Sequence, residues 1–459
     1  MARAAKKETP LTTEEKLAKA LVPDEEQPYP VPENWCWVRL GSLYEINPKN
    51  EASDELEAGF IPMEKISAGM CTSFNFDVRP WGKAKKGHVQ LTNGDVAFAK
   101  ISPCFENRKS MIVSGLPNGI GAGTTEIIVL RQPSVNNRFT FWLISTDDFI
   151  QKGRRTYSGT VGQQRISMDY VRQYPIPLPP LPEQQRIVTL IESLFADLDA
   201  AKEKLQAVLD GFAERRASLL HQAFTGELTR EWREENGVGL ESWVRKKIED
   251  FAFTTKLAGF EYTKNIAPNI AKEGIPLFKG KNVQQGQLVL EFESYIPKAV
   301  SDELPRSKLS RKCLLTPYVG TIGNVAIFDG SFEAHLGSNV GKIEIQEDTF
   351  EEFLLYYLRS DLGYRELTKE KKATAQESIS IQAIRNVFVP IPTRPEQKEI
   401  VRILDDIFAK ESHSRAAVES ALAKIDTMKK AILATAFRGG FETNNSSDES
   451  AKELLRGVL

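Results

Sequence analysis

The sequence predicts an α+β protein in which two mixed globules are each followed by one long helix. Two observations predict this fold class. A 55-residue stretch occurs twice, at 172–226 and 385–439, with a constant offset of 213 residues and 15 identical positions. The segments before each copy contain short strand-like runs broken by Gly, Pro and Asn, which is typical of small sheets joined by turns. The period is too long for a solenoid unit, so it indicates a duplicated half-protein.

Each copy of the repeat is predicted to form one continuous helix. In the first copy, Pro182 suits the first helical position and Glu183 places negative charge near the positive end of the helix dipole. Gly226 suits a left-handed C-terminal cap. From 183 to 224 there are 42 residues, which correspond to a rod of ~63 Å at 1.5 Å per residue. The second copy, 395–439, has the same design.

A heptad-like seam of apolar residues follows each helix. In the second helix Glu411 and Ser414 interrupt it. One such helix by itself would fit a bundle core or a homodimeric coiled coil. Two copies in one chain predict an intramolecular antiparallel pair, with a globule at each end, because the chain must return through a globule. The seam of the first helix consists of Ile187, Ile191, Leu194, Leu198, Ala201, Leu205, Val208 and Phe212.

In chain order, the sequence predicts six segments. Strands are expected at 94–101, 124–130 and 174–178, with a helix over 139–150, and Trp243-Val244-Arg245 is aligned with Trp37-Val38-Arg39. The polar C-terminal tail is predicted to be disordered. The segments are an N-terminal helix and linker (1–30), the first globule (31–180), the first long helix with a linker (181–235), the second globule (236–392), the second long helix (393–440) and the tail (441–459).

The net charge, the cysteine and histidine positions and the missing motifs limit the classes of function that the chain can have. The net charge is −2, so any nucleic-acid contact must rest on local basic surfaces. The four cysteines have no CxxC spacing and form no cluster with the four histidines, which predicts a reduced, metal-free cytoplasmic protein. The string 337–343 lacks the spacing and hydroxyl residue of a phosphate-binding loop, and nothing places Cys104 beside His88. We therefore predict no catalytic site in this chain.

Several loops combine basic residues with Gln, Asn or an aromatic ring. Such runs are most often solvated faces, but here they occupy matching positions in both globules. Lys and Arg neutralise phosphates, whereas Gln, Asn and Arg can contact base edges in the major groove. The candidate DNA-binding residues are Lys83, Lys85, Lys86, Lys100, Arg108, Arg154, Arg155, Tyr157, Gln163, Gln164, Arg165, Lys279, Lys281, Asn282, Arg306, Lys308, Arg311, Lys312, Lys371, Lys372 and Gln376.

The complete pattern resembles the specificity subunit of type I restriction-modification enzymes. The resemblance rests on the PEQ-initiated helix that ends in AF-x-G, on the Ile-Ser and Pro-Ile/Leu-Pro lead-in before it, and on the occurrence of both twice. It extends over about residues 31 to 440. It implies that each globule is a target recognition domain for one half of a bipartite, asymmetric DNA site. The long helices would set the spacing and dock two adenine methyltransferase subunits.

The resemblance also implies which chemistry lies elsewhere. S-adenosylmethionine, ATP and magnesium would be bound by partner subunits, which methylate adenine N6 and, with restriction and translocation motors, cleave DNA. The specificity subunit of a methylation-only or other phage-defence complex is the alternative. A self-sufficient methyltransferase or nuclease and a coiled-coil protein without a DNA role are rivals of other classes. Apolar residues at or beside the seams are expected to contact partners, namely Phe195, Leu220, Phe408 and Leu433.

Overall fold

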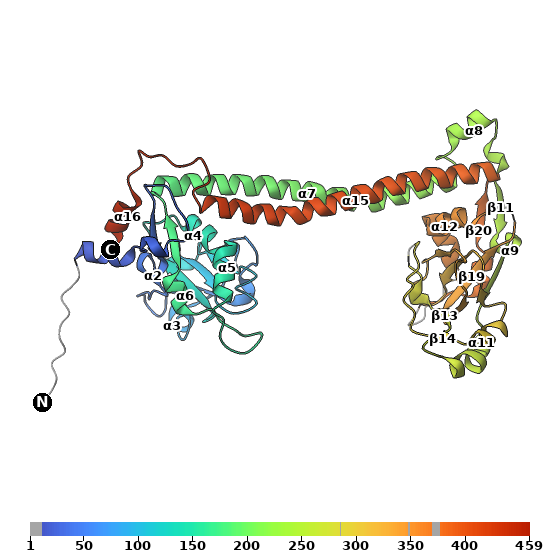
Figure 1. Ribbon diagram of the computed structural model, residues 1–459, viewed down its shortest axis with the longest axis horizontal. Coiled ribbons are helices and arrows are strands. Elements are labelled where there is room, and N and C mark those ends of the chain that lie inside the picture. Colours follow the sequence, from blue (N-terminus) through green and yellow to red (C-terminus); the bar gives the residue numbers. More distant parts are fainter. Residues whose placement is uncertain (1–11, 285, 348, 370–376) are drawn as a thin grey trace. The chain divides into compact units, whose positions relative to one another are not determined.

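The computed structural model describes residues 12–284, 286–347, 349–369 and 377–459. The chain divides into two compact units, Met1–Lys204 with Ser420–Leu459 (unit 1) and Leu205–Glu419 (unit 2). Each unit contains one globule and one end of both long helices, α7 (Leu181–Thr225) and α15 (Arg394–Ala436) (Figure 1). Within the described residues, no helix is both long and apolar enough to cross a bilayer.

The globule of unit 1 contains one two-stranded and two four-stranded sheets. The two-stranded sheet joins β1 (Cys36–Arg39) to β10 (Pro175–Leu178) in antiparallel register. The other sheets have the orders β2-β9-β6-β7 and β4-β3-β8-β5, with β3 and β8 parallel. Their strands are β2 (Glu45–Ile46), β3 (Glu57–Ile61), β4 (Asp77–Pro80), β5 (Val89–Thr92), β6 (Val96–Ala99), β7 (Ser110–Ile112), β8 (Ile120–Gly123) and β9 (Ile127–Arg131).

The globule of unit 2 repeats this topology. Its two-stranded sheet pairs β11 (Val244–Lys247) with β20 (Phe388–Ile391). The other sheets have the orders β12-β19-β16-β17 and β14-β13-β18-β15, again with one parallel pair, β13 and β18. This correspondence confirms the predicted α+β repeat. The strands are β12 (Ala252–Lys256), β13 (Ile275–Phe278), β14 (Tyr295–Ile296), β15 (Lys308–Leu309), β16 (Cys313–Pro317), β17 (Ala326–Phe328), β18 (Ala334–Leu336) and β19 (Val340–Ile345).

Short helices link the strands and cover the sheets. The helix predicted over 139–150 is two helices, because Thr146 accepts a hydrogen bond from the Phe149 amide at 3.3 Å and starts a new helix. Ser360 begins α13 in the same way. The helices of the globules are α2 (Leu40–Leu43), α3 (Trp81–Ala84), α4 (Asn137–Ile144), α5 (Asp147–Arg154), α6 (Met168–Gln173), α9 (Ile248–Phe251), α10 (Gly259–Glu261), α11 (Lys298–Asp302), α12 (Glu351–Arg359), α13 (Asp361–Thr368) and α14 (Ile381–Arg385).

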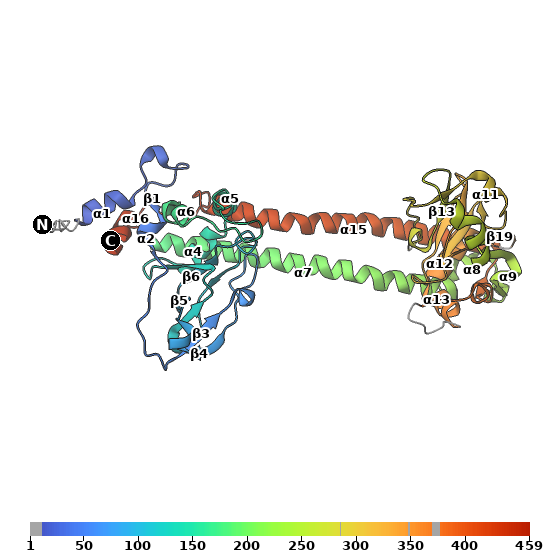
Figure 2. The ribbon, with the colours of Figure 1, turned by 90° about the horizontal axis from the view of Figure 1, so that it is seen from below.

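The two long helices run antiparallel inside each unit. In unit 1 the Arg186 side chain, near the start of α7, donates to the carbonyl of Thr443, just after the end of α15, at 2.8 Å, whereas Asp199, further along α7, pairs with Lys429 inside α15 at 2.5 Å. The partner position therefore falls as the α7 position rises (Figure 2). The predicted cap is confirmed, since Gly226 follows α7 directly with φ of 86°.

The predicted seam is buried toward the helix ends and open toward the middle. Ile187, Ile191 and Phe212 are buried, but Ala201 is exposed and the Val208 side chain is 44% exposed. In α15, Ile400, Leu404 and Ile425 are buried, whereas Ser414 near the middle is exposed. The globule cores enclose the helix ends, so the heptad pattern overestimates burial between them.

The two long helices start with equivalent contacts to their globules, one in each unit. Trp35 Nε1 donates to buried Glu183 at 2.7 Å, and Trp243 Nε1 donates to buried Glu396 at 3.0 Å. Because Cys36 pairs with Leu178 and Val244 with Ile391, Trp243 matches Trp35. The sequence alignment of Trp243 with Trp37 is therefore wrong by two residues. The glutamate of PEQ is a buried connector between helix and globule, in addition to its favourable place on the helix dipole.

The C-terminal tail is ordered, contrary to the sequence prediction. It ends in α16 (Ala451–Val458), whose Ala451 and Leu455 are buried in the core of unit 1. The helix packs against α1 (Thr13–Ala20), where Lys16 Nζ donates to the Leu459 carbonyl at 2.6 Å. Composition makes the segment look polar, but its few apolar residues share one helical face.

In unit 2 the short helix α8 (Arg230–Asn236) follows α7.

Candidate nucleic-acid interface

A projecting hairpin in unit 1 carries part of the predicted interface. Ser158 and Arg165 exchange backbone hydrogen bonds of 3.0 and 2.9 Å. Gly159 and Gly162 at the turn have φ of 109° and 85°, which suits glycine. The Val161 side chain at the tip is 95% exposed. The hairpin therefore presents an apolar tip flanked by the polar side chains of Gln163 and Gln164.

Arg165 at the base of this hairpin is already paired. Its guanidinium makes two bonds of 2.8 Å to the Glu126 carboxylate, and a third of 3.0 Å to the Gln163 carbonyl. The paired guanidinium lowers the pKa of Glu126 below its usual range. A contact between Arg165 and guanine would have to replace its two hydrogen bonds to Glu126. The aromatic ring of Tyr157 packs on Phe105 with its hydroxyl buried, so this predicted contact faces the interior.

The remaining predicted cations of unit 1 differ in availability. Lys83, Lys86, Arg154 and Arg155 are exposed, and Lys100 is half-buried. Lys85 pairs with Asp54 at 2.6 Å.

The prediction that Arg108 contacts DNA is corrected, because its side chain is engaged inside unit 1. Its guanidinium donates to the Ser145 carbonyl at 3.0 Å and pairs with Asp147, so it braces the junction of α4 and α5. Only 14% of its side chain is exposed, which leaves little surface for a phosphate.

Asn282, a predicted contact of unit 2, lies inside its globule. Asn282 is buried, and its amide donates to the carbonyls of Val289 and Glu291 at 2.9 and 3.0 Å. It therefore holds its own loop together and is not placed to contact a base. Arg306 is exposed. Lys371, Lys372 and Gln376 lie outside the described residues.

The other predicted cations of unit 2 have polar partners. Lys308 pairs with Asp302 at 2.5 Å and with Glu333 at 3.3 Å, and these carboxylates raise the pKa of Lys308. The remaining pairs are Lys279 with the Ser294 hydroxyl at 2.9 Å, Lys281 with Glu293, Arg311 with Glu344, and Lys312 with Glu352 at 2.5 Å.

The four residues predicted to dock partners belong to the unit cores. Phe195 is 5% exposed and packs against Trp142, with ring centroids 5.0 Å apart. Leu220 and Leu433 are also buried, and half-buried Phe408 packs against Tyr356. Phe195, Leu220 and Leu433 are therefore not exposed for docking, because the globules as well as the seams cover the apolar faces of the helix ends, while a partner contact by Phe408 stays a prediction.

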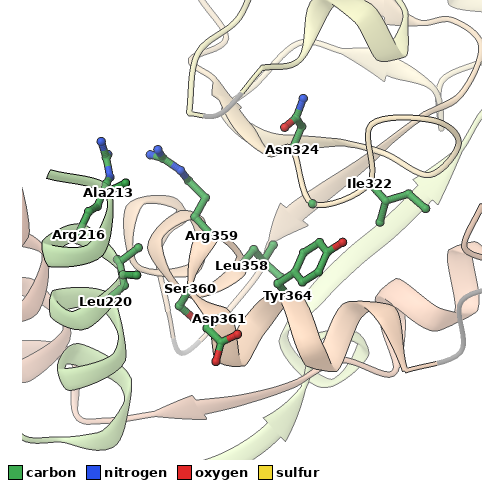
Figure 3. A pocket seen from close by; sticks show the side chains of 12 residues that line it. Ala213, Arg216, Leu220, Ile322, Asn324, Leu358, Arg359, Ser360, Asp361 and Tyr364 are labelled. Atoms are coloured by element: carbon green, nitrogen blue, oxygen red, sulfur yellow. The ribbon is translucent and has the colours of Figure 1, made fainter. Parts of the chain in front are cut away.

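The sequence analysis missed a pocket in unit 2. Its volume is about 420 Å³, and it lies between α7, the loop 322–324 and the junction of α12 with α13. Arg216 of α7 and Arg359 of α12 extend in the same direction on its wall (Figure 3). Neither arginine belongs to the basic loops from which the DNA contacts were predicted. Comparison of the two repeat copies position by position could have revealed them.

The described residues offer no metal-binding group of His, Cys, Asp or Glu side chains. All four cysteines are free thiols. Burial raises the pKa of the Cys36 and Cys313 thiols to about 12, so the reactive thiolate form is scarce near neutral pH. These thiols act as apolar core residues.

One family model matches the chain twice along its length, and curated proteins match part of it. The family model described as type I restriction modification DNA specificity domain matches residues 32–210 and again 241–420. The EcoAI specificity subunit of a type I restriction enzyme from Escherichia coli is 38% identical over 239 residues, 51% of this chain and 39% of that protein. The EcoEI specificity subunit from the same species is 33% identical over 262 residues, 55% of this chain and 43% of that protein. The match thus spans about two fifths of these relatives.

Solved structures share the fold over most of the chain. The HsdS subunit from Thermoanaerobacter tengcongensis aligns with a TM-score of 0.66 and 20% identity, covering 90% of this chain and 99% of that one. A chain from a study of complex assembly and conformational transition of the type I R-M system aligns with a TM-score of 0.64 and 22% identity, covering 90% and 100%. At this level of identity the likeness establishes the fold.

Proposed function

Because this chain belongs to the family of type I restriction-modification DNA specificity domains, we propose that it is the DNA-recognition subunit of such a complex. Each globule reads one half of a bipartite, asymmetric DNA site. The duplication carries this proposal: the two globules share one sheet topology, and the family model matches each of them together with the start of its helix. Two similar folds with different loops suit two different half-sites.

Our proposal leaves catalysis to partner subunits. Two methyltransferase subunits bind S-adenosylmethionine and methylate adenine N6, and motor subunits that use ATP and magnesium translocate and cleave DNA. The specificity subunit of a methylation-only or other phage-defence complex is the second candidate. Both candidates place the complex in the cytoplasm, where the DNA and the reduced thiols of this chain would be found.

Methylome sequencing of a host that carries the complete complex tests the proposal. We expect methylated adenines in one motif of two specified halves separated by an unspecified spacer. A strain without this chain should lack that motif, and the purified chain alone should neither bind S-adenosylmethionine nor modify DNA. Methylation by the chain alone would instead support the rival enzyme. A motif without motor-dependent cleavage would favour the methylation-only complex.

Insertion of four residues near Ala200 tests whether the long helices set the spacer. Four residues turn an α-helix by about 400°, so the seam shifts by only ~40° while the helix lengthens by ~6 Å. We expect unchanged half-site sequences and a spacer longer by one or two base pairs, since B-DNA rises about 3.4 Å per pair. Two inserted residues serve as the control and should disrupt the helix pair. An unchanged spacer would show that the helices do not set the distance.

A further inference from the structure

The repeat places the same three-residue arrangement in both units. In unit 1, Phe195 of α7 packs against Trp142, and the Lys429 ammonium of α15 lies 5.0 Å from the Phe195 ring centroid. In unit 2 the long helices exchange roles. Phe408 of α15 packs against Tyr356, and the Arg216 guanidinium of α7 lies 4.2 Å from its ring centroid. Lys429 and Arg216 are thus matching cations, 213 positions apart.

The matching cations differ in their counter-ions. Lys429 pairs with Asp199 at 2.5 Å. The position that matches Asp199 in the second helix is Ser412, which cannot neutralise Arg216. Among the described residues, Arg216 has no carboxylate within ion-pair distance. Unit 2 therefore has a cation at the position of Lys429 but no carboxylate at the position of Asp199.

A second cation strengthens this difference. The alignment of α4 with α12 places Arg359 at the position of Ser145. Two residues after these positions, each unit has an aspartate that is already paired. In unit 1 Asp147 pairs with Arg108, and in unit 2 the matching Asp361 pairs with Arg365 at 2.8 Å. Arg359 is likewise without a carboxylate partner among the residues described.

Arg216 and Arg359 line one pocket of about 420 Å³ (Figure 3). Burial, and then the nearby Arg216 charge, lower the pKa of Arg359. Gly286 lies so close that a Cβ there would be 2.5 Å from an Arg359 terminal nitrogen, which leaves the guanidinium little room to turn away. Two like charges held together without a counter-ion favour a bound anion.

The pocket opens beside a predicted DNA-binding loop. Asn324 on its wall donates to the Val283 carbonyl at 3.1 Å, and the Gly286 amide donates to the Val325 carbonyl at 2.9 Å. These bonds join the loop 322–325 to the loop that carries Lys279 and Lys281. Leu220 and Tyr364 add apolar wall surface suited to a sugar ring next to a charged group.

We propose that Arg216 and Arg359 together bind one backbone phosphate of the DNA that the second globule recognises. Guanidinium groups bind phosphate oxygens through paired hydrogen bonds, and a phosphate would neutralise the charge that Asp199 neutralises in unit 1. This contact carries no sequence information and fixes the position of the second globule on its half-site. It rests on the proposed function, since it requires DNA at the second globule.

The test measures DNA binding by the assembled complex across a range of salt concentrations. The variants are R216A, R359A and the double variant. We expect each single variant to raise Kd by about tenfold, equally for the methylome-derived site and for unrelated DNA. The slope of log K against log salt should fall by about 0.9 in the double variant, which loses both contacts to the one phosphate. R365A is the matched control, since that arginine is already paired with Asp361.

An unchanged salt slope in the double variant would overturn the proposal. So would loss of assembly with the partner subunits in variants whose thermal unfolding is unchanged, because the pocket would then bind an acidic side chain of a partner. The double variant should show the effect of one lost contact, and a slope change of about 1.8 would assign two separate phosphates. If the unmodified complex itself fails to bind its methylome-derived site, the proposed function fails, independently of the pocket.

Discussion

The two units contain the same joint but close it with different chain segments. In unit 1, Glu183 accepts from Trp35 and from the Asn444 amide at 2.8 Å, so its partners include the tail after α15. In unit 2, Glu396 accepts from Trp243 and pairs with buried Arg233 at 2.6 Å, in the segment after α7. Each carboxylate is therefore covered by the chain that follows the other long helix. The duplication therefore preserved the connection of helix to globule, while the covering segments diverged.

The largest effect is expected from removing the charge of Glu396. Glu396→Gln leaves the buried Arg233 guanidinium without its counter-ion, which we expect to cost about 3–5 kcal/mol. Glu183→Gln disrupts hydrogen bonds from neutral donors and should cost about 1–3 kcal/mol. Urea unfolding followed by tryptophan fluorescence measures both.

Glu419→Gln on the surface of α15 is the control and should change little. Equal losses in the two buried variants would mean that Arg233 contributes no more than the neutral donors of unit 1.

The matching phenylalanines provide a second comparison. Phe195 is almost fully buried against Trp142, whereas Phe408 is half-buried. Phe195→Ala should destabilise unit 1 by about 3–5 kcal/mol, and Phe408→Ala should destabilise unit 2 by less, because solvent can enter part of the space. Denaturant unfolding of the two variants tests the order. A Phe195→Ala variant that unfolds like the unmodified chain but fails to bind partner subunits would restore the original docking prediction.

The C-terminal helix distinguishes unit 1 from unit 2. Leu455→Ala removes a buried side chain of α16 and should destabilise unit 1 by about 2–3 kcal/mol. Leu454→Ala, at a half-buried neighbour, should cost less. Hydrogen exchange of the α1 and α16 amides measures the effect locally. Equal, rapid exchange in the unmodified chain and both variants would indicate that the tail does not pack.

The smallest effects are expected in the hairpin of unit 1. Gln164→Ala or Arg165→Ala should alter one half-site only, at a cost of about 1 kcal/mol, near the lower end for a lost base contact. The reason is that Arg165 must exchange Glu126 for a base, which offsets part of the gain. Lys86→Ala should instead weaken binding to every sequence and reduce the salt slope. A hairpin variant that changed both half-sites equally would contradict separate readers.

The duplication, the two long helices and the family could all be predicted from the amino-acid sequence. Repeat register, Pro182 and Gly226, and strand-like runs are local signals, because backbone preference and apolar period act over a few residues. They located β6 and β9 correctly. They also identify residue types that suit contacts with DNA.

Which of those side chains are exposed and unpaired depends on contacts between distant parts of the chain. Asn282 and Arg108 are polar and stand in basic loops, yet each is engaged with the backbone of its own globule. Phe195 and Leu433 lie at the edge of a heptad seam, yet the globule core covers them. Conversely, Arg216 and Arg359 are 143 positions apart and meet only because α7 packs beside α12. Burial and counter-ions depend on neighbours distant in the chain, and a local pattern contains no information about them.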